Sequence, residues 1–214
     1  MRFILLVSIL LSLVTGTARA DMVWHDAYKS PLSDWGAYQY YRNVKQPMAE
    51  RDARNKAAGP KVQPVVAHAP MSASDFRRGP RTNVVTRYVA TLPLAAADAA
   101  QLTAALDTTM AQLQKAGRKN NVATAMATTI TLAHMVLDRD DVDASKVDTL
   151  VVSLNDVLAN APQFKQLTSQ ERQQMADELL LSSALIAILH QAGAIDASKA
   201  FAEQVLITMT GSAR

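Results

Sequence analysis

The sequence predicts an all-α protein, a compact bundle of about six helices around a central apolar helix at residues 169–192, preceded by a proline-rich extended arm. Two observations lead to this prediction. Between residues 80 and 210, apolar residues recur at helical spacing in one segment after another, so each segment carries one apolar stripe. One segment is instead apolar on every side. Because a stripe must be buried against another element, the striped helices are expected to wrap around that segment.

The central segment has start and stop signals of its own. Thr168 and Glu171 have the spacing of a capping box, and Gly193 stands where a left-handed residue commonly ends a helix. The apolar run Leu179–Leu189 is well short of the roughly 20 residues that span a bilayer. We therefore expect a core helix surrounded by protein, in which the two serines inside the run bond back to carbonyls four residues earlier.

The remaining segments each show a single stripe. Residues 85–92 fit a helix, although their β-branched content leaves a strand open. The next three helices are expected at 95–116, at 121–137 with an asparagine cap, and at 145–158, with Pro162 beyond the end of the last. A short final helix capped by Asp196 follows the central one. The expected inward residues of these last four helices include Leu102, Leu106, Met110, Val122, Met126, Ile130, Leu150, Leu154, Leu158, Phe201, Val205 and Met209.

Residues 1–20 have the pattern of a cleaved secretory signal, with Arg2 before an apolar core and a small-x-small site at the end. The mature chain is then expected to begin at Asp21 and to be exported, either to the periplasm or out of the cell. The chain has no cysteine, so its stability in an oxidising compartment must come from its core. After signal cleavage we expect no transmembrane segment.

Residues 21–79 form the arm, which is rich in proline and lacks a sustained apolar period. Its first third holds six of the ten aromatic residues of the mature chain, which is unusual for a linker. One interpretation is an aromatic anchor that binds another envelope protein, a glycan or a membrane interface. The alternative is that the rings fold back onto the helical domain. The candidate partner-binding residues are Trp24, Tyr28, Trp35, Tyr38, Tyr40 and Tyr41.

Charge is distributed unevenly along the mature chain. Residues 21–82 contain 10 basic and 6 acidic residues, a net charge of 10 − 6 = +4, whereas residues 83–214 contain 10 and 13, a net charge of 10 − 13 = −3. The N-terminal part can therefore dock on its own domain or reach an anionic surface such as phospholipid headgroups. It has no dense basic block, so we expect no nucleic-acid partner.

Motifs that carry chemistry are weak in this sequence. No two of the four histidines fall at i,i+3 or i,i+4, and the acidic run 138–148 lacks the glycine and the final glutamate of a calcium loop. There is no G-x-S-x-G elbow and no glycine-rich phosphate loop. Asp177 and Glu178 are adjacent and point to different sides of a helix, unlike a cooperating acid–base pair. We predict no metal site and no cofactor, and a catalytic role has no positive support.

A resemblance rests on the motif Phe164-x-x-Leu167-Thr168, on Gln173 and Glu178 in the helix that follows, and on the asparagine-started, Ala/Thr-rich helix at 121. In these features the chain resembles a family of exported bacterial proteins called domain of unknown function 6683, over roughly residues 76–193. This family commonly has an aromatic residue where the chain has Met175. The resemblance implies a secreted helical domain and brings no established activity or binding residues.

Three functional hypotheses follow from the sequence. The leading one is an exported, non-catalytic binding or interaction module of the bacterial envelope, with Trp24–Tyr41 as its contact element. The second is a hydrolase whose site lies in the helical bundle, around His134, His190 or the acidic run. The third is a peripheral envelope-surface protein held to anionic lipid by its basic, aromatic arm.

Overall fold

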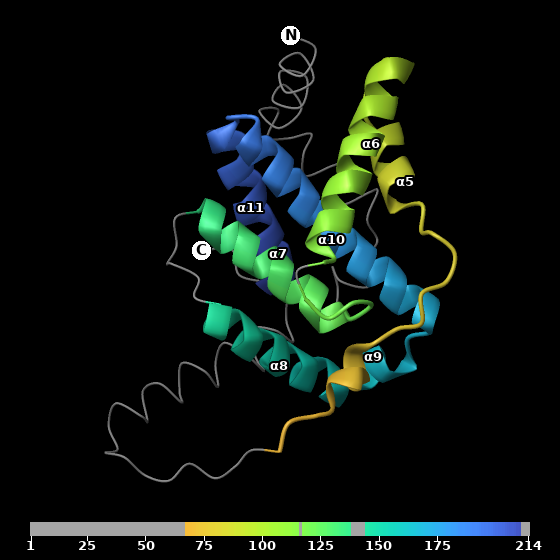
Figure 1. Cartoon of the computed structure of the whole chain (residues 1–214), viewed down its shortest axis with the longest axis vertical. Helices are drawn as coiled ribbons and strands as arrows, with labels where there is room; N and C mark the ends of the chain where they lie inside the picture. The colour runs from red at the N-terminus through yellow and green to blue at the C-terminus, as the bar shows by residue number, and fades with distance from the viewer. Residues whose placement is uncertain (1–66, 116, 138–143, 211–214) are drawn as a thin grey trace.

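The computed structural model describes residues 67–115, 117–137 and 144–210, and this part of the chain is all-helical (Figure 1). It contains seven α-helices and one 3₁₀ turn, and the described residues form no strand beyond an isolated bridge between Asp75 and Asn121. The elements are η2 (Met71–Ser74), α5 (Val84–Ala90), α6 (Ala96–Leu113), α7 (Val122–Val136), α8 (Ala144–Asn160), α9 (Pro162–Gln166), α10 (Ser169–Gln191) and α11 (Ile195–Thr210).

Helix α10 is the predicted central helix. It crosses the whole domain in Figure 1 and packs against α5, α6, α7 and α11. Every residue from Met175 to Leu189 is buried except Ala187, which is half-buried. The apolar run is therefore covered on all sides by other helices, as its composition predicts. In the described residues no helix combines the length and apolarity needed to cross a membrane.

Both ends of α10 follow the predicted signals. The Thr168 hydroxyl accepts a hydrogen bond from the Glu171 backbone N–H at 3.3 Å, while the Thr168 N–H donates to the Glu171 carboxylate at 2.7 Å. At the other end Gly193 has φ +77°, a left-handed conformation that glycine adopts without a Cβ penalty. The Ala194 N–H then donates to the Leu189 carbonyl at 3.0 Å, which closes the last turn.

The two serines of α10 also bond as predicted and join the helix to α7. The Ser182 hydroxyl donates to the Glu178 carbonyl at 3.1 Å, and the Ser183 hydroxyl lies 3.1 Å from the Leu179 carbonyl. Ser183 is also 2.9 Å from the hydroxyl of Thr129 on α7. These buried hydroxyls thus have partners inside an otherwise apolar contact.

The structure decides one open alternative and differs from the sequence prediction at two places. Residues 84–90 form a helix, which removes the strand alternative. Pro162 begins the short helix α9 rather than simply following α8, because proline suits the first turn, where its missing N–H would be unpaired anyway. Helix α11 begins at Ile195 and has 16 residues, so Asp196 lies in its first turn and is not its cap, and the helix is not short.

We expect Leu181→Ala to lower the free energy of unfolding by about 2–5 kcal/mol, because it leaves a cavity in the centre of the domain. Leu181 is 0% exposed, whereas Met135 on α7 is 57% exposed and provides the control. Met135→Ala should change the free energy by less than about 0.5 kcal/mol. Urea denaturation followed by circular dichroism measures both, and equal losses would contradict a core centred on α10.

Candidate functional site

Residues 68–82, which we call the strap, run across the helices before α5 begins (Figure 1). The strap starts on α8, where the Ala69 N–H donates to one oxygen of Asp156 at 2.7 Å and the His68 ring lies 2.6 Å from the other. The Asn155 amide donates to the carbonyls of Ala69 and Pro70 at 3.1 and 3.2 Å. Two neighbouring side chains of α8 therefore fix the first residues of the strap.

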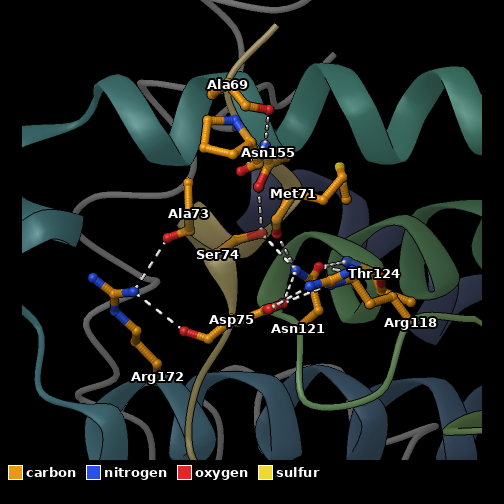
Figure 2. Close-up of polar contacts among 11 residues, drawn as sticks. Ala69, Met71, Ala73, Ser74, Asp75, Arg118, Asn121, Thr124, Asn155 and Arg172 are labelled. Atoms are coloured by element: carbon orange, nitrogen blue, oxygen red, sulfur yellow. Dashed lines mark hydrogen bonds and ion pairs between the residues drawn. The ribbon is translucent and has the colours of Figure 1, made fainter.

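Asn121, the cap of α7, is the centre of the next set of contacts (Figure 2). Its amide nitrogen lies 3.0 Å from the Met71 carbonyl and 2.8 Å from the Ser74 hydroxyl, and its amide oxygen accepts from the Thr124 N–H at 2.9 Å. Ser74 in turn donates to Asn155 at 2.7 Å. The side chains of Asn121, Ser74 and Asn155 are all buried, so this polar cluster joins the strap to α7 and α8 at once.

Two arginines bind the strap around Asp75 (Figure 2). Arg118 donates from Nε and Nη2 to the two carboxylate oxygens of Asp75, at 2.8 and 2.6 Å. The hydrogen bond from Arg118 is the main reason why the pKa of Asp75 lies below its usual value. Arg172 on α10 donates to the carbonyls of Ala73 and Asp75 at 3.2 and 3.3 Å, and its guanidinium lies 4.4 Å from the centre of the Phe164 ring.

The second half of the strap follows one face of α10. The Arg77 N–H donates to Ser169 at 2.6 Å. Gln173 accepts from the Gly79 N–H at 2.7 Å and donates to the Pro80 carbonyl at 3.0 Å. Thr82 donates to Asp177 at 2.7 Å. The three residues of α10 that make these contacts are spaced by four, so they lie on one face of the helix and form a polar ladder, namely Ser169, Gln173 and Asp177.

A pocket of about 420 Å³ lies where the strap meets α5, α6 and α10. The strap contributes three polar residues to its wall, α6 and its C-cap contribute polar and apolar ones, and α5 contributes two valines. Asp177, the last residue of the polar ladder, comes from α10. The lining residues are Arg78, Arg81, Thr82, Val84, Val85, Asp107, Met110, Ala111, Gln114 and Asp177.

Asp177 has one satisfied and one unsatisfied oxygen. Its side chain is only 4% exposed. Oδ2 accepts from Thr82, but Oδ1 is buried and has no hydrogen-bond partner, because Nη2 of Arg78 is 3.9 Å away. Burial raises the pKa of Asp177, against the lowering effects of Thr82, Arg78 and Gln173. A buried acceptor without a donor destabilises a fold by about 1–3 kcal/mol, which marks Asp177 as a candidate functional residue.

The arginines of the pocket are positioned by neighbouring side chains. Arg81 forms an ion pair with Asp107 on α6. Arg78 donates to the Gln114 amide oxygen at 2.9 Å, which turns its guanidinium toward the pocket wall formed by α6. The formal charges of the lining residues are two positive and two negative, so their sum is 2 − 2 = 0.

Glu178 is buried beside Asp177 but belongs to a different contact. Its carboxylate accepts from Gln174 at 3.0 Å and from Arg87 on α5 at 3.4 Å. It does not line the pocket. The two adjacent carboxylates therefore point to different partners, as their positions on the helix require.

The residues singled out by sequence fall elsewhere. The six arm aromatics, Trp24 to Tyr41, and residues 138–143 of the acidic run lie outside the described residues. His134 is half-buried on α7 and His190 is exposed in the last turn of α10, and neither lines the pocket. Of the pocket residues only Asp177 is weighed for chemistry from the sequence, whereas Met110 is predicted there as a core residue. The available signal was the polar residues at every fourth position of α10 ahead of and into its buried part.

Fold and site together define a small all-helical domain that holds its own N-terminal strap along the polar ladder of the central helix. The chain belongs to the family of unknown function DUF6683, whose model matches residues 2–214. The match covers almost the whole chain, which is more than the segment 76–193 on which the resemblance rested. Neither a curated protein nor a solved structure matches the sequence.

Asn121→Ala should lower the free energy of unfolding by about 2–4 kcal/mol, because it removes a cap worth about 1 kcal/mol and leaves buried groups of the strap unpaired. The matched control is Asn83→Ala, since Asn83 also precedes a helix but makes no side-chain cap bond. Urea denaturation of both variants tests the prediction. If Asn83→Ala is as destabilising as Asn121→Ala, the cluster does not hold the strap.

Two aspartates should affect stability with opposite signs of pH dependence. The lowered pKa of Asp75 stabilises the folded state above the pKa of the unfolded chain, and this contribution is lost as the pH falls through the folded pKa. The raised pKa of Asp177 destabilises the folded state at neutral pH, and this penalty disappears as the pH falls from the folded toward the unfolded pKa.

At pH 7 we therefore expect Asp75→Asn to melt below the wild type and Asp177→Asn to melt at or above it. Thermal melts between pH 7 and 3 measure the differences. The Asp177 difference should shrink as the pH falls toward the ordinary pKa of aspartate, whereas the Asp75 difference should persist to lower pH, because its folded pKa lies below that value. A large stability loss in Asp177→Asn at pH 7 would contradict the unsatisfied state of Oδ1.

Proposed function

We propose that this protein is an exported, non-catalytic binding module of the bacterial envelope, whose helical domain holds the base of an aromatic arm. The observation that carries the proposal is the strap. Side chains from α8, α10 and the cap of α7 bind it through buried and partly buried hydrogen bonds centred on Asn121, Asn155 and Gln173. Contacts at this density fix the chain from residue 68 onward to the domain.

The described domain has a core of its own. Its buried apolar residues form one continuous cluster around α10, and four aromatic residues contribute to that cluster or pack against it. These four are Phe76, Tyr88, Phe164 and Phe201. Four aromatic residues of the described part of the chain thus already supply this core, which supports a partner-binding role for the six rings between Trp24 and Tyr41.

The spacing along the chain also supports such a role. Tyr41 precedes Ala67 by 67 − 41 = 26 residues, which is long enough for the aromatic segment to reach beyond the domain. Tyrosine and tryptophan combine a large apolar face with a polar edge, so they suit a glycan or the surface of another envelope protein. The excess of basic charge in residues 21–82 favours a second candidate, attachment to anionic lipid.

Replacing Trp24, Trp35 and Tyr38 together by alanine should abolish capture of envelope components by the mature chain and leave its melting temperature unchanged. The assay is cosedimentation with purified peptidoglycan and pull-down from an envelope extract. The matched control replaces three non-aromatic residues of the same arm, Lys29, Gln39 and Asn43, by alanine and should bind as the wild type does.

A large drop in melting temperature of the aromatic variant would reject the proposal, because the rings would then be part of the core. Binding to vesicles that contain anionic lipid, if lost at about 0.5 M salt, would favour the lipid candidate, since salt at that concentration screens exposed charges over a few ångströms. Binding to peptidoglycan that resists the same salt would favour the glycan.

A further inference from the structure

We propose that the pocket between the strap and helices α5, α6 and α10 binds an uncharged polyhydroxylated ligand, a mono- or disaccharide, one hydroxyl of which bridges Asp177 and Arg78. The inference does not rest on the aromatic arm, because every lining residue lies between positions 78 and 177. The volume of about 420 Å³ falls in the range of about 300–1,000 Å³ that is usual for small-molecule sites.

The first argument is the geometry of the unsatisfied oxygen. Asp177 Oδ1 and Arg78 Nη2 are 3.9 Å apart, too far for a direct hydrogen bond. An oxygen atom placed about 2.8 Å from each of them would bridge the two groups, once a small movement of the Arg78 side chain, which is 41% exposed, uncovers the buried Oδ1. That atom must donate to the carboxylate and at the same time accept from the guanidinium.

A hydroxyl group meets both requirements, and ionic groups meet only one. An ammonium group donates to a carboxylate but has no lone pair for the guanidinium, while a carboxylate accepts from the guanidinium but has no proton for Asp177. The charges of the lining residues also favour an uncharged ligand. A cation would lie against Arg78 and Arg81, an anion would lie against Asp107 and Asp177, and the lining charges cancel.

The second argument is the composition of the wall. The wall combines an apolar surface with groups that can donate and accept hydrogen bonds, and its apolar part comes from Val84, Val85, Met110 and Ala111. A sugar ring has this same division, with C–H groups on its faces and hydroxyls around its edge. An apolar wall beside a few fixed polar groups is the usual construction of a small-molecule site.

The third argument is that the polar groups are held before any ligand arrives. Thr82 fixes one oxygen of Asp177 at 2.7 Å, Gln114 holds Arg78 at 2.9 Å, and Asp107 pairs with Arg81. Gln173 binds the strap between Arg78 and Arg81, at Gly79 and Pro80. A site whose side chains are already oriented loses less conformational entropy on binding.

The test is isothermal titration calorimetry of the mature full-length chain with glucose, galactose, N-acetylglucosamine, maltose and cellobiose, and with the charged analogues glucosamine and glucose 6-phosphate. We expect at least one uncharged saccharide to bind with a Kd of about 1 mM or tighter, and each charged analogue to bind more weakly than its uncharged parent. Absence of binding by all five uncharged saccharides, or tighter binding of a charged analogue, would overturn the proposal.

Three variants locate the binding. Asp177→Ala and Arg78→Ala should each weaken the affinity about tenfold or more, because each removes one partner of the bridging hydroxyl. The Arg78 side chain is 41% exposed, so its replacement keeps the test valid if the Asp177 variant folds poorly. Asp196→Asn, an exposed carboxylate on α11, is the control and should bind like the wild type.

The arm variant with Trp24, Trp35 and Tyr38 replaced by alanine separates this inference from the proposed function. If the pocket binds the saccharide, this arm variant should keep full saccharide affinity. If saccharide binding disappears with the arm rings and survives in Arg78→Ala, the pocket proposal fails while the proposed function stands. If saccharide binding survives in the arm variant but the wild type captures no envelope component, the proposed function fails while the pocket proposal stands.

Discussion

A segment with little regular secondary structure can pack on a domain only if most of its backbone N–H and C=O groups find hydrogen-bond partners beyond its own turns. The strap of this protein meets that requirement with side chains from three helices. Asn155 on α8 and Asn121 at the start of α7 bond its first half, and Gln173 on α10 bonds its second half through both an acceptor and a donor. The position of the strap, and with it the wall of the pocket, depends on these few side chains.

The same requirement explains why α10 has two different halves. Its C-terminal half is surrounded by α7 and α11 and contains the apolar run from Leu179 to Leu189. Its N-terminal half begins exposed at Ser169–Glu171 and is covered on one face by the strap, against which Gln173 and Asp177 are buried. The backbone groups of the strap need polar partners there. Polar side chains spaced by four residues bond the strap, and the apolar side chains between them pack against the other helices.

The fold could be predicted from sequence because its signals are local. A capping box, a left-handed glycine and stripes of apolar residues each lie within one helix, and they placed α10 and the helices from 84 to 160 correctly. Helix α9 was missed because five residues are too short to show a period. The start of α11 was misplaced by two residues, since Asp196 suits either the cap or the first turn.

The candidate site could not be predicted in the same way, because it is made by contacts between residues that are far apart in the chain. Thr82 and Asp177 are separated by 95 positions, and no local pattern indicates that they meet. The proline-rich composition of residues 21–79 suggested a linker or extended arm, whereas Ser74, near its end, is held by buried hydrogen bonds. Proline content indicates the backbone conformation of a segment, but it does not indicate which residues of the domain the segment contacts.

Among the polar residues of α10 that face the strap, Asp177 differs from Gln173 in one respect. Gln173 uses both its donor and its acceptor on the strap, so holding the strap accounts for its burial. Asp177 uses only Oδ2 for this purpose, and a threonine or asparagine at that position could accept the same hydrogen bond from Thr82 without a buried charge. The role in the strap therefore does not explain the second oxygen. The place of Asp177 in the pocket wall does, because a ligand that donates to Oδ1 would provide the partner that the fold omits.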